Sequence, residues 1–348
     1  MDSKKKKILI IALSIIGFIG IMYLGISIFV DNMLGKTNTD VIDEDEIEIV
    51  EDLTPQANEV VNFMLVGADN LDFSVGRENS YVEERSDVFK LISLDYTDKQ
   101  IKITSLDRDV VVWIPDKNEF GRFNWAYSFG GGKYAMNTIN YNLDLNVNKY
   151  VSFSFQGFKD VIDAIGGVDI RLTQAEADNI NHDPQSGVHC VEGDNHLDGA
   201  SALSYARIRS IDSDFQRMNR QNYIITSVLK KFKESSFDEL FDAVNACLPY
   251  VTTNLTNQEI KKYIFDLLSF DLTNIKEQTY PLKREDDVCV NKDSMGGYIL
   301  RSYSGQVISL HKFIYGTDDY EPTKRIYDLE KKTYDTYGEF YEGSGLIP

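Results

Sequence analysis

The chain has 348 residues, of which 43% are hydrophobic and 12% aromatic, and these proportions suit one large folded domain or two ordinary ones. The formal net charge is −19. General binding to nucleic acid is excluded, because the neutralisation of phosphates requires a basic face. Any anion that this protein binds must therefore meet a local cluster of cations.

An apolar segment near the N-terminus predicts a membrane span. Residues 8–30 carry no charge and follow four lysines at 4–7. As a helix that rises about 1.5 Å per residue, the segment is about 34 Å long, which is enough to cross the hydrocarbon core. The lysines place residues 1–7 in the cytoplasm and the rest of the chain outside the cell membrane. A cleaved signal peptide is the alternative, but the segment is longer than a usual signal core and no A-x-A-like site follows it.

An acidic segment at 31–58, poor in aromatic residues, predicts an extended and solvated linker that leads to a folded domain at 59–318. The domain opens with an apolar, β-branched run at 60–67 that ends in glycine and is typical of a buried strand. Two more runs, separated by DYTDK, predict a hairpin, and a third predicts a further strand. These three runs are 87–94, 100–106 and 150–155.

Helical patterns alternate with these strands. Apolar residues at helical spacing, followed by two glycines, predict a helix at 156–167, and Thr173 with Glu176 forms a capping box for a second helix at 173–180. Amphipathic patterns predict two more helices, at 236–251 and 256–270. Residues 319–348 are rich in tyrosine and charge without a period, and they predict a polar C-terminal tail. Strands interleaved with helices indicate a single mixed α/β or α+β domain.

The common catalytic and metal motifs are missing. The three cysteines, Cys190, Cys247 and Cys289, show no CxxC spacing; they allow one disulfide of open pairing with a spare thiol, or three free buried thiols. The sequence GGGKY at 130–134 lacks the glycine spacing and the Ser or Thr of a phosphate-binding loop. What remains is a set of arginines, acids and one amide at the ends of predicted strands, where α/β folds place their sites. This set comprises Asp69, Arg85, Asp87, Arg108, Asp109, Arg122 and Asn124.

The stretch YARIRSIDSDFQRMNRQ, residues 205–221, adds four arginines in an acidic chain. If residues 205–209 are extended, Arg207 and Arg209 point the same way. If a helix begins near Asp214, then Asp214, Arg217 and Gln221 share one face with Arg220 beside them. Guanidinium groups and a helix N-terminus suit pyrophosphate, and carboxylates suit a divalent cation that bridges its oxygens. Surface ion pairs are the alternative interpretation of each single Arg–Asp pair.

Several of these motifs, in order over about residues 60 to 316, together resemble the LytR–CpsA–Psr family. They are RSDV, SLDRDVVVWIP, RFNWAYSFGG, GFKDVIDAIGGVDI, GDNHLDGASALSYARIRSIDSDFQRMNRQ and LHKFIYG. The resemblance implies an extracytoplasmic phosphotransferase that moves a glycopolymer, such as teichoic acid or capsular polysaccharide, from a polyprenyl-pyrophosphate carrier to peptidoglycan. It also implies an α/β/α-type sandwich with a mixed central sheet and an apolar lipid groove.

The resemblance assigns roles to residues by motif position. Asp69 and Asp87 would hold Mg²⁺ (or Mn²⁺), and Asp109 or Asp214 would orient an arginine or take the proton of the acceptor hydroxyl. The catalytic set would be Arg108, Asp109, Asp214 and Arg217. The groups that bind pyrophosphate would be Arg85, Arg108, Arg207, Arg209, Arg217, Arg220 and Gln221, with Arg122 and Asn124 in place of the family's lysine and asparagine. Five aromatic side chains would line the lipid groove or belong to the ordinary core, namely Phe153, Phe155, Phe158, Tyr205 and Phe215.

Two departures from the family pattern keep a second function open. Asp107 stands where the family has proline, and Leu71 stands where it has arginine. A non-catalytic protein of the envelope, which binds polyprenyl phosphate as a scaffold or regulator, is therefore the alternative. Residues 1–7 are too few to fold, so direct regulation through DNA is excluded.

Overall fold

The computed structural model describes residues 35, 37–50, 59–68, 86–236, 239, 248–267, 269–282, 291–292, 297–300 and 302–342. The predicted span at 8–30 and most of the predicted helix at 236–251 lie outside these residues, as do Cys247 and Cys289. Cys190 is buried with a free thiol. In the part of the chain that is described, no helix has the length and apolar character of a membrane span.

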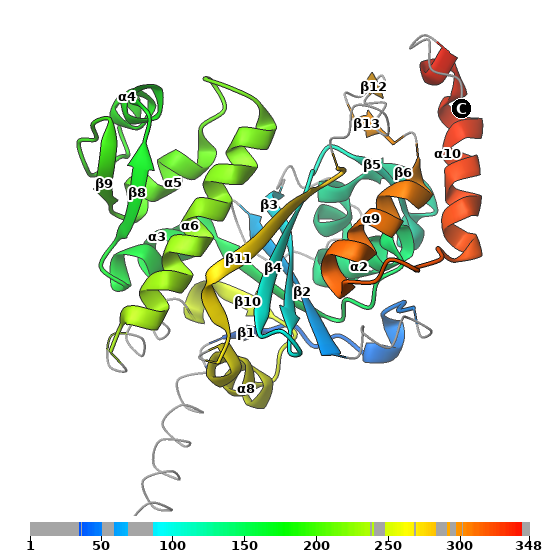
Figure 1. Cartoon of the computed structure of the whole chain (residues 1–348), viewed down its shortest axis with the longest axis horizontal. Helices are drawn as coiled ribbons and strands as arrows, with labels where there is room; N and C mark the ends of the chain where they lie inside the picture. The colour runs from blue at the N-terminus through cyan, green and yellow to red at the C-terminus, as the bar shows by residue number, and fades with distance from the viewer. Residues whose placement is uncertain are drawn as a thin grey trace, which may run out of the picture.

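A mixed sheet lies at the centre of the molecule (Figure 1). Among the described residues it has seven strands in the order β1-β10-β7-β2-β3-β4-β11. β3 is antiparallel to both β2 and β4, whereas β2 with β7 and β4 with β11 are parallel. The strands are β1 (Asn38–Thr39), β2 (Val60–Ala68), β3 (Ser86–Asp95), β4 (Gln100–Leu106), β7 (Lys149–Ser154), β10 (Val251–Thr253) and β11 (Asp271–Tyr280). The predicted hairpin and the predicted strands at 60–67 and 150–155 are confirmed.

Helices cover both faces of the sheet (Figure 1). Period-two alternation along β3 sends Phe89 and Leu91 into the main core, beside α2 (Phe123–Leu143) and α9 (Tyr303–Tyr315), and turns Val88, Ile92 and Leu94 to the opposite face. That opposite face is covered by α3 (Phe155–Ala164), α6 (Asp214–Glu234) and α8 (Asn257–Leu267).

A second, smaller core joins α3 and α6 to a peripheral unit that follows α3 in the chain. The unit contains the antiparallel pair β8 and β9, with α4 between them and α5 after them. The capping box predicted for α4 is present, because Thr173 Oγ1 accepts a hydrogen bond from the backbone N–H of Glu176 and the Glu176 carboxylate accepts one from the N–H of Thr173. The elements are β8 (Val168–Leu172), α4 (Gln174–His182), β9 (Gly193–Leu197) and α5 (Gly199–Arg207).

Both ends of the described chain pack more tightly than the sequence predicts. The acidic segment is not simply extended and solvated, because β1 pairs with β10 and Ile47 is buried in the main core. The expected polar tail contains a helix, α10 (Lys324–Glu342), whose Ile326 and Leu329 are buried. The buried carboxylate of Asp144 fixes the start of α10, since it accepts hydrogen bonds from Thr323 and Arg325.

Candidate functional site

The ends of β2 and β4 and the start of β3, which adjoin predicted site residues in the sequence, lie at the same edge of the sheet. Ala68, the last residue of β2, pairs with Ser86 of β3 on one side and with Ser154 of β7 on the other. β4 ends at this edge as well, because Lys90 pairs with Ser105 and β4 runs antiparallel to β3. The sheet therefore brings together the strand ends beside which Asp69, Asp87 and Arg108 stand in the sequence.

The edge carries a β-bulge at Asp87. Gly67 pairs with Val88 while Ala68 pairs with Ser86, so residue 87 is the extra residue of β3. Bulges re-aim side chains and are frequent beside active sites. The Asp87 side chain is not described, and Asp69, Leu71 and Arg85 lie outside the described residues, so the assignment of Asp69 and Asp87 to a metal stays a prediction. Among the described side chains, no group of three His, Cys, Asp or Glu residues is arranged to hold a metal ion.

The turn after β4 meets the start of α2 in a cluster of two arginines and one carboxylate. The Asp109 carboxylate lies 3.0 Å from Arg122 Nη1 and 3.8 Å from Arg108 Nε, and the Arg122 guanidinium lies 5.7 Å from the ring centre of Trp125. The Arg108 and Arg122 side chains are each 15% exposed. One anion thus lies beside two guanidinium groups whose side chains are both partly exposed to solvent.

Asp107 shapes this turn. Its Oδ1 accepts a hydrogen bond from the backbone N–H of Asp109 at 3.1 Å, and its carbonyl accepts one from Val110 at 3.2 Å. An Asp side chain that accepts from the backbone two residues on stabilises a turn by itself, so the turn needs no proline here. Asn124 packs beneath it and is 1% exposed, and its buried Oδ1 finds no hydrogen-bond donor among the described residues.

The stretch at 205–221 does not begin as an extended segment, contrary to the sequence prediction. Residues 205–207 complete α5, whose N-cap Asp198 accepts a hydrogen bond from the N–H of Ser201, and Arg209 lies in the loop before α6. Both Arg207 and Arg209 are exposed. The Arg207 guanidinium lies 4.8 Å from the ring centre of Phe155, the first residue of α3, and this contact turns it toward the sheet edge.

The predicted helix start at Asp214 is confirmed. The two arginines in its first turns, Arg217 and Arg220, differ in their surroundings. Arg217 and Gln221 are 2% and 6% exposed. Arg220 is engaged by the protein itself, since Nε donates to Glu176 Oε1 at 2.8 Å, Nη1 donates to the carbonyl of Ile208 at 3.2 Å, and Nη2 binds Asp212. Arg220 therefore holds the loop 208–213 against α4. The Asp214 side chain is not described.

The Glu176 carboxylate is charged in this arrangement. Burial alone would raise the pKa of Glu176, but hydrogen bonds from the Thr173 backbone and from Arg220 outweigh burial and hold this pKa below its usual value. Arg220 consequently neutralises a second anion besides Asp212, and it carries little free charge for a ligand.

An apolar groove begins at the arginine end and runs between the sheet and α6. Its first cavity, about 40 Å³, is lined by Arg207, Gln221 and Val88 with the aromatic rings of Phe153, Phe155 and Phe158. A second cavity of about 270 Å³ shares Phe153 and Phe158 with the first, and a third of about 310 Å³ shares Leu65 and Val151 with the second. The three cavities thus adjoin one another in a row along one groove between the sheet and α6.

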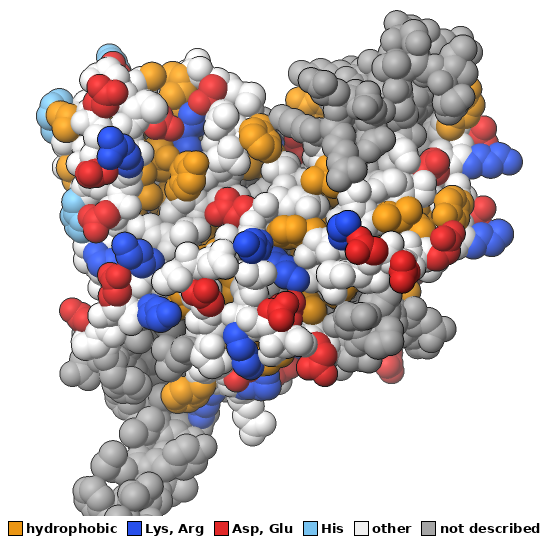
Figure 2. All heavy atoms as spheres, in the orientation of Figure 1, with side chains coloured by type: hydrophobic (Ala, Val, Ile, Leu, Met, Phe, Trp, Pro, Cys, Tyr) orange, Lys and Arg blue, Asp and Glu red, His pale blue; other side chains and the backbone are white. Residues whose placement is uncertain are grey.

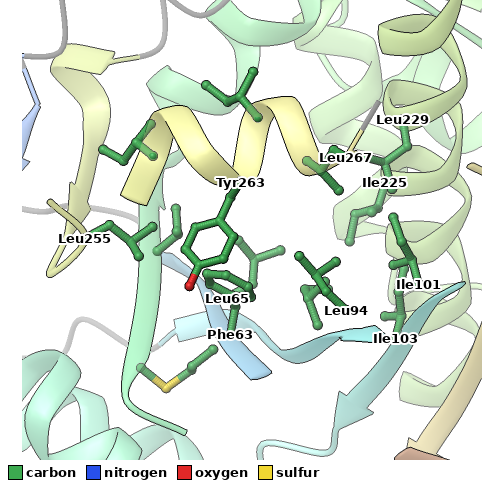
Figure 3. Close-up of a pocket in the computed structure, with 15 residues that line it drawn as sticks. Phe63, Leu65, Leu94, Ile101, Ile103, Ile225, Leu229, Leu255, Tyr263 and Leu267 are labelled. Atoms are coloured by element: carbon green, nitrogen blue, oxygen red, sulfur yellow. The ribbon is translucent and has the colours of Figure 1, made fainter. Parts of the chain in front are cut away.

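The far end of the groove lies under α8 (Figure 3). Tyr263 and Leu267 point from α8 toward Phe63 and Leu65 of the sheet, and Ile225 and Leu229 of α6 close the side (Figure 3). On α6 the lining residues are Gln221, Ile224, Ile225, Val228 and Leu229, which is one helical stripe. The groove therefore has a polar, cationic end and a wholly apolar end.

Sequence reasoning identified only part of this groove. Phe153, Phe155 and Phe158 line it, as the resemblance implies, whereas Tyr205 is buried in the second core and Phe215 lines none of the three cavities. The stripe on α6 and the α8 residues were missed, although their helical spacing was the available signal. On the face that Figure 2 shows, basic and acidic side chains are interspersed without a broad basic patch.

Comparisons with known proteins agree with this geometry. A family model, the LytR_cpsA_psr family, matches residues 25–304. A relative from Bacillus mycoides, "Polyisoprenyl-teichoic acid--peptidoglycan teichoic acid transferase TagU", is 31% identical over 266 residues, which cover 74% of this chain and 82% of the relative. The solved structure "TagT bound to LIIa-WTA" superimposes with a TM-score of 0.59 at 20% identity, over 86% of this chain and 99% of that chain.

A further solved structure, "LytR-CPS2A-psr family protein YwtF (TagT) with bound octaprenyl pyrophosphate lipid", has a TM-score of 0.56 at 18% identity and covers 86% of this chain and 99% of that chain. These likenesses show a shared fold with a mixed central sheet. The family model spans most of the sequence, including every motif that surrounds the arginine cluster and most of the groove. The chain therefore belongs to the LytR–CpsA–Psr family.

Proposed function

We propose that this protein transfers a glycopolymer from a polyprenyl-pyrophosphate carrier to peptidoglycan. The observation that carries the proposal is an apolar groove that ends at the cation Arg207 and the polar Gln221. A polyprenyl pyrophosphate likewise joins a long apolar tail to an anionic head. The name of the TagU relative, which describes such a transfer, and the bound octaprenyl pyrophosphate named for a solved family structure support it.

The dimensions of the groove suit a long tail. Its floor along β3 extends from Val88 to Leu94, and these six steps along the strand span about 20 Å at roughly 3.3 Å each. Its wall along α6 extends from Gln221 to Leu229, about 12 Å at roughly 1.5 Å per residue. A tail of several isoprene units would lie along this path with its pyrophosphate near Arg207.

In the proposed reaction, a hydroxyl oxygen of peptidoglycan attacks the phosphorus that carries the glycopolymer. A new P–O bond forms to the acceptor, the P–O bond to the lipid-linked phosphate breaks, and polyprenyl phosphate leaves. The protein needs mainly to position the groups and to stabilise charge. Arg108 and Arg122, oriented by Asp109, would face the transferred phosphate, and Arg207, Arg209 and Arg217 would bind the leaving phosphate.

The proton of the attacking hydroxyl passes to a carboxylate, for which Asp109 and Asp214 are the candidates. Asp109 is 3.0 Å from Arg122 Nη1, so its first role is to orient that arginine. The variants Asp109→Asn and Asp214→Asn distinguish the two residues. Loss of the base removes the acidic limb of the pH–rate profile, whereas loss of an orienting group lowers the rate at every pH.

We also propose Mg²⁺ (or Mn²⁺) as the cofactor. The donors fit, because carboxylates are the usual protein ligands of Mg²⁺ and the sheet register brings the segments of Asp69 and Asp87 to one edge. The ion would neutralise charge on the pyrophosphate oxygens. The expected result is loss of turnover in EDTA and its return with Mg²⁺. Turnover that continues in EDTA would exclude the cation.

The main test uses a synthetic polyprenyl pyrophosphate that carries a short glycan, with peptidoglycan oligomers as acceptor. The wild-type protein is expected to release polyprenyl phosphate and to form a phosphodiester, and Arg108→Ala and Arg217→Ala are expected to lose this activity. Binding of the lipid without turnover on any acceptor would favour a scaffold that only binds polyprenyl phosphate. Equal activity of the arginine variants and the wild type would refute the assignment of the site.

We propose that residues 8–30 anchor the chain in the cell membrane, with residues 1–7 in the cytoplasm and the folded domain outside. The uncharged segment after four lysines supports this topology. Protease added to intact cells is expected to degrade the folded domain. Full protection in intact cells, with degradation only after lysis, would refute the topology.

A further inference from the structure

A lysine lies in the face of the sheet that forms the groove. Along β3 the residues on this face are Val88, Lys90, Ile92 and Leu94. Val88 lines the cavity at the arginine end, and Ile92 and Leu94 line the cavity at the far end. Lys90 lies between them under α6 and is 1% exposed. A cation in the middle of an otherwise apolar strand face has a cost of desolvation, so its contacts have to compensate.

The contacts of Lys90 tie three elements together. Its Nζ donates to Ser105 Oγ of β4 at 2.7 Å, to Asn222 Oδ1 of α6 at 2.6 Å and to the carbonyl of Met218, also in α6, at 3.4 Å. Asn222 Nδ2 in turn donates to Glu277 Oε2 of β11 at 3.0 Å. The network therefore binds α6 to the sheet at the turn that also carries Arg217 and Gln221.

Two charges flank Lys90, and neither touches it in this network. The negative charge of Glu277 reaches it through Asn222, and Arg217 in α6 adds a positive charge nearby. The residue that pairs with Lys90 on the adjacent strand β2 is the apolar Leu65. The pKa of Lys90 is lowered to about 7; burial is the largest cause, the charge of Glu277 opposes the lowering, and the charge of Arg217 adds to it. A doubly charged anion beside Arg217 would stabilise the protonated form of Lys90 and so raise its pKa again.

We propose that Lys90 is a positioning residue of the pyrophosphate site, which fixes the first turns of α6 so that Arg217 and Gln221 are in place, and which takes up a proton when the anion binds. The inference deepens the proposed function and rests on it. Binding and protonation are then linked: at pH 7.5 the bound state holds up to about three quarters of a proton more than the free state, and affinity falls as the pH rises. For each unit by which the anion raises the pKa of Lys90, the protonated form binds about tenfold more tightly.

The chain offers a matched control in Lys102. This lysine is also buried, on the neighbouring strand β4, but it contacts Asp95 at 2.9 Å and the carbonyl of Ile314 in α9, on the opposite face of the sheet. Lys102→Met removes a buried lysine without touching α6. Lys90→Met removes the charge and keeps an unbranched side chain that fits the same space.

The experiment titrates the full-length protein with geranylgeranyl pyrophosphate by calorimetry, at pH 7.5, in two buffers with different heats of ionisation. Wild type and Lys102→Met are expected to take up the same fraction of a proton on binding, and Lys90→Met is expected to take up less and to bind about tenfold more weakly. Ionisation of the ligand is common to all three proteins and cancels in the comparison. Equal proton uptake by wild type and Lys90→Met would overturn the inference.

Hydrogen exchange without ligand separates this inference from the proposed function. Amides at 214–222 are expected to exchange faster in Lys90→Met than in wild type, and at the wild-type rate in Lys102→Met. If wild type fails to bind the lipid pyrophosphate, the proposed function fails, and unchanged exchange at 214–222 then overturns the positioning role as well. Faster exchange confined to Lys90→Met supports that role whatever the ligand is.

Discussion

Replacing Ile225 by tryptophan is expected to shorten the groove while its cationic end stays intact. Ile225 lies on α6 and is the residue that lines all three cavities, so a larger ring there would enter the path between the first cavity and the last. The cluster of Arg108, Asp109 and Arg122 lines none of these cavities. The variant should therefore keep its affinity for inorganic pyrophosphate and lose affinity for long tails.

The size of the effect follows from the apolar area that the tail buries. Transfer from water contributes roughly 0.8 kcal/mol per buried methylene, so a five-carbon isoprene unit contributes up to about 4 kcal/mol, and incomplete burial lowers this figure. Since about 1.4 kcal/mol corresponds to a factor of ten, each unit that the groove accepts can strengthen binding by up to about a thousandfold. Exclusion of one unit removes the same factor.

The assay measures the affinity of the segment from residue 35 onward for geranyl, farnesyl and geranylgeranyl pyrophosphate in aqueous solution. Wild type is expected to bind more tightly with each added isoprene unit. Ile225→Trp is expected to show no further gain in affinity after the first or second unit. Tyr223→Trp is the control, because Tyr223 lies on the same helix, is 56% exposed and lines none of the three cavities. If Ile225→Trp gains as much per unit as Tyr223→Trp does, the groove is not the path of the tail.

Three further predictions concern stability. Arg220→Met should lower the free energy of unfolding by up to about 3 kcal/mol in a urea titration, since it leaves the partly buried Glu176 carboxylate without its arginine. The stability of wild type relative to Lys90→Met should rise with pH between about 7 and 10, by at most about 1.4 kcal/mol per pH unit, because the unfolded chain there binds the lysine proton that the folded chain has released. Asp144→Ala should release α10, and the first cleavage in limited proteolysis should move to this helix, since its start loses several hydrogen bonds to one buried carboxylate.

Each of these predictions has a clear contrary result. Arg171 forms an exposed ion pair, so Arg171→Met is expected to leave stability unchanged, and an equal loss in both arginine variants would refute the role given to Arg220. A stability difference between wild type and Lys90→Met that does not vary with pH would mean that the lysine stays charged in the fold. Unchanged proteolysis of Asp144→Ala would mean that apolar packing alone holds α10.

The sequence by itself determined much of the local structure of this protein and predicted the composition of its candidate site. Apolar, β-branched runs located β2, β3 and β4, and Thr173 with Glu176 located the start of α4, because these features depend on neighbours a few residues apart. The motifs also predicted which loops meet at the sheet edge, and Arg108, Asp109 and Arg122 do lie together there. Three predictions of local structure were wrong among the described residues. Residues 205–207 are helical and not extended, the acidic segment is partly packed against the domain, and the C-terminal tail contains a helix.

Tertiary structure alone decided what each arginine does. Arg217 and Arg220 lie three residues apart on one helix, yet Arg220 is bound by Glu176, 44 residues earlier in the chain, and so belongs to the scaffold. Likewise, the sequence alone gives no reason for a lysine at position 90 in an apolar strand. The folded structure gives one, because Asn222, 132 residues later, accepts a hydrogen bond from Lys90. A charged side chain takes its role from the partner that folding brings to it, and partners this distant leave no local pattern in a single sequence. The groove has the same origin, since it exists only where α6 and α8 cross the face of the sheet.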